Sequence, residues 1–146
     1  YYTLDIIILQ KILRVGTLIM EYLERYFRLF DETRTSEKAK EELMSLFTDD
    51  VVFVLNGYTQ SGKDKFRAFV TSVYENLIDL KHMYEGWKLN EETGRYETNW
   101  AICGKRKDQT VYTQTGVDIV ELDENGKIKY IENVPNDSNM FSDYKN

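Results

Sequence analysis

The sequence predicts a single α+β domain in which helices come first and an antiparallel sheet follows. Two observations support this prediction. Apolar residues recur at three- and four-residue steps as far as Leu77, and beyond it they alternate with polar residues along four segments joined by short turns. Helices followed by strands are typical of α+β folds, whereas parallel α/β folds alternate the two. The chain has 146 residues, which is close to the usual size of one domain.

Three helices are expected before the sheet. The first has Met20, Leu23, Phe27 and Phe30 on one face. The second begins after Ser36, because serine is a good N-cap residue. The buried strand Val51–Leu55 comes next and ends at an Asn-Gly turn. A third helix follows Ser61, and its apolar stripe consists of Phe66, Phe69, Val70, Val73 and Leu77.

Four strand candidates form the second half of the chain, at 78–89, 95–105, 110–122 and 127–134. The short turns between them predict an antiparallel meander. Within 116–122, Val120 and Leu122 lie on one face while Val117 and Ile119 lie on the other. The helices can cover only one face. We therefore expect a homodimer formed through the outer face of the sheet.

The two ends of the chain are expected to lie outside the domain, which we assign to residues 20–135. Residues 1–19 are apolar but carry charges, and they are too short to span a membrane. They also lack the features of a secretory signal, so a cytoplasmic location is expected. The segment is either an extension of the first helix or not native, since Met20 resembles a natural start. Residues 136–146 are expected to form a loose polar tail.

Composition excludes several classes of function. The net charge of −6 argues against nucleic acids and anionic membranes as partners. A single cysteine, Cys103, and a single histidine, His82, do not suffice for a disulfide or for a typical zinc site. The glycine-rich loops that bind nucleotide phosphates are also absent. We therefore predict no cofactor and no metal.

Four motifs together resemble the NTF2-like superfamily, in particular its SnoaL-like and ketosteroid-isomerase-like branch. They are Tyr26–Asp31 (YFRLFD), Leu46–Val52 (LFTDDVV), Ser61–Lys63 (SGK) and Gly116–Ile128 (GVDIVELDENGKI). The resemblance implies a cone in which three N-terminal helices pack into a curved mixed sheet dominated by a four-strand antiparallel meander. It also implies a mostly apolar pocket that is open at one end. The superfamily contains isomerases, cyclases, dehydratases, epoxide hydrolases and non-enzymatic binders, so the fold does not define an activity.

The resemblance also implies roles for three positions. Tyr26 matches the tyrosine that donates a hydrogen bond to the substrate oxygen in the isomerase branch, and Asp118 matches the aspartic acid that acts beside it. An apolar site keeps such a carboxyl neutral, so that Asp118 could donate a hydrogen bond to a developing oxyanion. The general base of the isomerases falls at Leu55, which cannot take a proton. The steroid-isomerase mechanism is therefore not expected.

Further candidates come from strand alternation and from the expected pocket wall. His82 lies on a face that can border the pocket, and imidazole titrates in a useful range. Asn133 could orient a carbonyl group. Trp100, Tyr96 and Tyr112 could form apolar walls.

Two functions remain open. The first is a cofactor-free enzyme of isomerase, cyclase or hydratase type that acts on a small apolar molecule bearing a carbonyl or hydroxyl group. In this case Asp118 and Tyr26 polarise the oxygen, and His82 or a water moves the proton. The second is a non-catalytic ligand-binding or dimerisation module on the same fold. Asp118 would then pair across a subunit interface, and Tyr26 and His82 would be hydrogen-bonded core residues.

Overall fold

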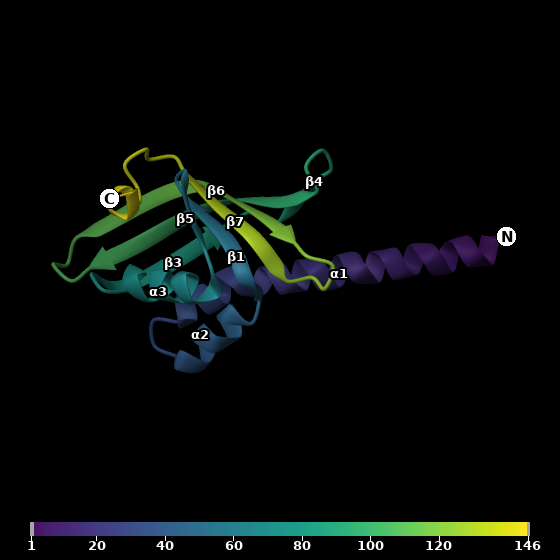
Figure 1. Ribbon diagram of the computed structural model, residues 1–146, viewed down its shortest axis with the longest axis horizontal. Helices are drawn as coiled ribbons and strands as arrows, with labels where there is room; N and C mark the ends of the chain where they lie inside the picture. The colour runs from purple at the N-terminus through teal and green to yellow at the C-terminus, as the bar shows by residue number, and fades with distance from the viewer. Residues whose placement is uncertain (1, 146) are drawn as a thin grey trace.

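The computed structural model describes residues 2–145, with side chains described for 5–11 and 18–144. Helices pack along one side of a seven-stranded sheet, and the first helix runs on beyond the sheet toward the N-terminus (Figure 1). The helices precede the main part of the sheet in the chain, so the predicted α+β class is confirmed. In the described residues, no helix is both long enough and apolar enough to cross a membrane.

The three main helices are α1 (Tyr2–Glu32), α2 (Glu37–Met44) and α3 (Lys63–Val73). α1 has 31 residues, since it includes residues 2–19. Ser36 caps α2 as predicted, since its Oγ accepts a hydrogen bond from the Ala39 amide at 3.0 Å. α3 ends earlier than its apolar stripe suggests, and Leu77 instead begins the next strand.

The strands are β1 (Phe47–Leu55), β2 (Tyr58–Ser61), β3 (Leu77–Tyr84), β4 (Lys88–Asn90), β5 (Arg95–Arg106), β6 (Val111–Leu122) and β7 (Ile128–Pro135). They are arranged in the order β2-β1-β7-β6-β5-β3, with β4 also paired to β5. β3, β5, β6 and β7 form the predicted antiparallel meander. β1 runs parallel to β7 and makes the sheet mixed.

The predicted strand 78–89 is interrupted in the structure. It separates into β3 and β4 at residues 85–87. Gly86 has a φ of 114°, a conformation that few residues other than glycine adopt. The interruption allows the indole of Trp87 to turn inward, where it is buried and stacks on Phe27 at 5.7 Å between ring centroids. Burial of this large ring favours the break over a continuous strand.

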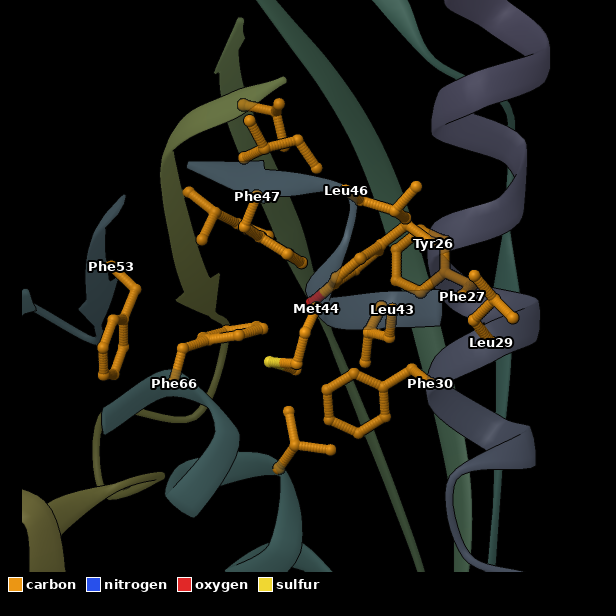
Figure 2. Close-up of a cluster of buried hydrophobic side chains, with 14 of the residues drawn as sticks. Tyr26, Phe27, Leu29, Phe30, Leu43, Met44, Leu46, Phe47, Phe53 and Phe66 are labelled. Atoms are coloured by element: carbon orange, nitrogen blue, oxygen red, sulfur yellow. The ribbon is translucent and has the colours of Figure 1, made fainter. Parts of the chain in front are cut away.

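Aromatic rings fill the space between the helices and the sheet. Figure 2 shows the Tyr26 and Phe30 rings extending from α1 into the cluster, where Phe47 and Phe66 face them from β1 and α3. The centroids of Phe47 and Phe66 lie 4.5 Å apart, and those of Tyr26 and Phe47 lie 6.1 Å apart. These edge-on and tilted contacts fix the position of α1 over the sheet.

The segment after β7 does not form a loose tail. It folds back and ends in a short 3₁₀ helix, η1 (Ser142–Lys145). Phe141 and Tyr144 pack on Phe69 of α3, with centroid distances of 5.9 and 5.6 Å. The Tyr144 hydroxyl also hydrogen-bonds the Ser72 hydroxyl at 2.5 Å. The expectation of a loose tail was wrong because these two rings anchor an otherwise polar segment.

Candidate functional site

A cavity of about 420 Å³ lies between α1, α3 and the inner face of the sheet. Its volume is in the range of small-molecule sites. Most of its walls are apolar, and they include Phe30, Phe53, Phe69, Ile102 and Ile131. Exposed lining residues such as Asn76, Arg106 and Asp143 mark its open end. Leu55, Trp100 and Asp118 are buried at the other end.

One row of side chains crosses four strands at the buried end. Leu55 of β1 pairs with Asn133 of β7, Asn133 pairs with Asp118 of β6, and Asp118 pairs with Thr98 of β5. Residues directly opposite each other on neighbouring strands point to the same face and lie in contact. The sheet therefore places Asp118 and Asn133 side by side, with Leu55 next to them.

Three polar atoms at this end of the cavity have no hydrogen-bond partner in the part of the chain that the structure describes. They are Asp118 Oδ1, Asn133 Oδ1 and Trp100 Nε1, and all three are buried. Trp100 lies opposite Gly116, where a Cβ atom would come within 2.4 Å of the indole, so only glycine leaves room for the ring. Buried polar atoms are nearly always paired. These groups are thus available to polar atoms of a ligand.

Burial raises the pKa of the Asp118 carboxyl from its ordinary 3.8 to about 7. The nearby Trp100 indole N–H opposes this increase, although the two groups do not meet hydrogen-bond geometry. At pH 6 the carboxyl is therefore mostly neutral, while an ordinary aspartate is ionised. A neutral carboxyl can donate a hydrogen bond, which a carboxylate cannot do.

Tyr26 is a second donor in the same cavity. Its side chain is buried, and its ring packs edge-on against Phe27 at 4.9 Å. Burial, and next the nearby charge of Asp118, raise the pKa of the Tyr26 hydroxyl well above its usual value of 10. The hydroxyl therefore keeps its proton across the physiological range and can only act as a neutral donor or acceptor.

His82 lines the cavity from β3 and is held by Asp31 of α1. The His82 Nδ1 atom lies 2.6 Å from Asp31 Oδ1, and the His82 backbone N–H donates to Asp31 Oδ2 at 3.0 Å. The contact between Asp31 and His82 is not predicted by the sequence patterns. One signal was available: Asp31 comes four residues after Phe27, which places a carboxyl on the buried face of the helix.

The remaining predicted site residues line the cavity, with one exception. Leu55, Trp100, Asn133 and Tyr112 line the cavity, the last near its open end. Tyr96 does not line it, so its predicted position in the pocket wall was wrong. Tyr96 pairs with Val120, one row beyond Asp118, and its ring packs against the core cluster instead. Among the described residues, no group of three or more His, Cys, Asp or Glu is placed to hold a metal ion.

Comparison with known families identifies the class of protein. Residues 23–131 match the model of the SnoaL-like domain, so the chain belongs to this family. The chain is 51% identical to an NTF2-like protein of unknown function from Exiguobacterium sp. 255-15, with a TM-score of 0.77. That match covers 80% of this chain and 98% of the other. The predicted NTF2-like, SnoaL-like resemblance is confirmed.

More distant structures share the fold. RV0760c from Mycobacterium tuberculosis, in complex with estradiol-17β-hemisuccinate, is 15% identical with a TM-score of 0.64, covering 77% of this chain and 88% of that one. SalBIII, an epoxide hydrolase/cyclase-like enzyme in pyran ring formation in polyether salinomycin, is 15% identical with a TM-score of 0.69, covering 82% and 92%. At such identities the similarity shows the fold alone. A search of curated proteins returned no significant match.

The raised pKa of Asp118 predicts a specific dependence of stability on pH. The folded pKa of about 7 exceeds the ordinary 3.8, so between these values the unfolded chain ionises this carboxyl and the folded chain does not. The contribution of Asp118 to the unfolding free energy should therefore be fully present below pH 3.8 and fall by up to about 1.4 kcal/mol per pH unit as pH rises toward 7.

Urea unfolding of the wild type and of Asp118→Asn from pH 5 to pH 8 measures this effect. We expect the stability of the wild type relative to the variant to fall steadily to about pH 7 and then to level off. Asp50→Asn, at an exposed carboxyl of β1, is the matched control. A constant difference between wild type and Asp118→Asn over this range would contradict a raised pKa.

Proposed function

We propose that this SnoaL-like domain binds a compact apolar molecule with a carbonyl or hydroxyl group and carries out acid–base chemistry on it. The observation behind the proposal is the buried, unpaired carboxyl of Asp118 inside an apolar cavity of ligand size. Burying a carboxyl without a hydrogen-bond partner costs stability. Such carboxyls are therefore typical of functional sites. The chemistry would be of the isomerase, cyclase or hydratase type, and it needs no cofactor.

The two neutral donors define how the ligand would be bound. Tyr26 retains its proton at neutral pH, Asp118 retains its proton below its pKa of about 7, and both residues line the cavity. Hydrogen bonds from both to one ligand oxygen would polarise it and stabilise negative charge that develops there. Trp100 and Asn133 add an indole N–H and a carboxamide at the same end. The apolar walls would hold the remainder of the molecule.

A proton acceptor is needed on another part of the cavity surface. Leu55 occupies the position at which the isomerase branch carries its general base, so that mechanism is not proposed. His82 is one alternative on the cavity wall, and a bound water is another. Among proteins of this fold, the estradiol-17β-hemisuccinate complex of RV0760c and the pyran ring formation by SalBIII support a ligand of this general chemistry.

We also propose that the protein is a cytoplasmic homodimer paired through the outer face of the sheet. The central part of that face carries no charge, and its residues are Met83, Asn99, Ala101, Cys103, Thr113, Thr115, Val117, Ile119 and Val134. Charged residues such as Lys81 and Glu97 flank this central part. An uncharged patch with a polar rim suits association with a second copy of itself.

Ligand binding is tested by thermal unfolding of the wild type and of Asp118→Asn with a panel of small apolar ketones, enols, phenols and epoxides. A ligand present at one hundred times its Kd adds about 2.7 kcal/mol to the stability of the folded state. We expect at least one compound to stabilise the wild type and to lose most of this effect in Asp118→Asn. Asp50→Asn should respond like the wild type.

The fate of that compound then separates the two functions. Its conversion by the wild type but not by Asp118→Asn would support the enzyme, and its recovery unchanged would support a ligand-binding module. If no compound stabilises the wild type while Asp118→Asn folds normally, the proposed ligand class is wrong.

The proposed interface is tested by the sedimentation of Val117→Lys and Val111→Lys. Val117 lies at the middle of the outer face, and Val111 lies on the same face at the end of β6. A lysine at the middle of a symmetric interface meets its own copy, so Val117→Lys should sediment as a monomer. Val111→Lys should remain a dimer. A wild type that is already monomeric at micromolar concentration would exclude the interface.

A further inference from the structure

Asp31 contacts His82 through both of its carboxylate oxygens. Oδ1 lies 2.6 Å from Nδ1 of the ring, and Oδ2 accepts the backbone N–H at 3.0 Å. We infer that Asp31 is a positioning residue, which holds His82 in the tautomer with its proton on Nδ1 and leaves Nε2 free to act as the base of the cavity. The role of His82 as base rests on the proposed function, whereas the tautomer does not.

The tautomer follows from the chemistry of the two groups. A carboxylate can only accept hydrogen bonds, so a ring nitrogen in contact with it must carry the proton. In a neutral ring the proton on Nδ1 leaves a lone pair on Nε2. No hydrogen bond to Nε2 is found within the described residues, and this atom is not among the buried polar atoms that lack a partner. Nε2 is therefore open to a ligand or a water.

The position of His82 at the edge of the sheet explains why its backbone N–H is free to bind Asp31. β3 is the last strand in the sheet order, and only β5 pairs with it on this path. An edge strand leaves alternate N–H groups without a strand partner. The backbone N–H of His82 is one of these groups, and it donates its hydrogen bond to Asp31. Rotation of the carboxylate would break both bonds together, so the contact resists rearrangement.

Neighbouring rings restrict the imidazole further. Phe27 lies at 5.2 Å and Phe30 at 5.0 Å from the His82 ring centroid, and both come from the same helix as Asp31. Phe30 also packs edge-on against Tyr26 at 6.0 Å. α1 thus presents the donor Tyr26 and the residue that orients the base within two turns of one helix.

The proposed proton transfer is balanced without a co-reactant. Nε2 takes a proton from the ligand, and the ring becomes an imidazolium whose charge lies against the Asp31 carboxylate. The electron pair left on the ligand moves toward the oxygen that Asp118 and Tyr26 polarise. Return of the proton from Nε2 to the ligand restores the neutral ring.

The test uses the fact that the chain contains one histidine. With histidine labelled by ¹⁵N, a long-range ¹H–¹⁵N correlation spectrum of the intact protein reports only His82. We expect the neutral ring of the wild type to carry its proton on Nδ1. In Asp31→Asn, the carboxamide N–H₂ can donate to Nδ1, so the proton should move wholly or partly to Nε2. Glu32→Gln makes the same chemical change at the next residue, whose carboxylate pairs with Arg28, and should leave the spectrum unchanged.

Two results would overturn the positioning role. One is a wild-type ring with its proton on Nε2, which decides the matter even if Asp31→Asn does not fold. The other is a folded Asp31→Asn with the wild-type tautomer. Because this spectrum needs no ligand, it stands whether or not the proposed function holds.

The role of His82 as base is measured with a compound that the wild type converts. Asp31→Asn should bind it with a Kd close to that of the wild type, since Asp118 and Tyr26 are intact. Its kcat should fall by about 100-fold or more, which is the usual contribution of a general base. A reversed tautomer with an unchanged kcat would show that His82 is not the base.

Discussion

The antiparallel pairing of β5, β6 and β7 buries the carboxyl of Asp118 without a partner, and most other features of the site depend on this placement. Asp118 lies between Asn133 and Thr98 in the sheet, and its side chain lines the cavity on the inner face. Gly116, two residues earlier, leaves space for the Trp100 indole next to it. Apolar walls complete the surroundings and favour the neutral acid. The cavity therefore contains a proton donor where an ordinary aspartate would be ionised.

α1 connects this donor to the opposite part of the cavity. Tyr26 projects from the helix into the aromatic cluster (Figure 2). Asp31 reaches His82 from the last turn of the same helix. The packing of Phe30 between Tyr26 and His82 keeps the two groups at a constant separation. Rigid placement on helices and strands, rather than on loops, is what acid–base chemistry requires, because proton transfer depends on short and well-aligned contacts.

Much of the fold could be predicted from the sequence because it depends on local patterns. The change of hydrophobic period after α3 separates the helices from the sheet, and Ser36 marks the start of α2 as expected. The misses concern contacts between distant residues. The break of the strand at Gly86 depends on the burial of Trp87, and the ordering of the segment after β7 depends on Phe69. For the same reason, the contact between Asp31 and His82 could not be predicted from local patterns, since 51 residues separate them in the sequence.

Direct titration of the Asp118 carboxyl tests the central claim most simply. Aspartate labelled with ¹³C at the carboxyl carbon gives one signal for each residue, and the signal missing from Asp118→Asn identifies this one. The signal should remain that of a neutral acid at pH 5 and shift with a midpoint near pH 7, because the carboxyl is buried and unpaired. A midpoint near 4, the value of an exposed aspartate, would show that the carboxyl is solvated or paired and would contradict the proposed donor.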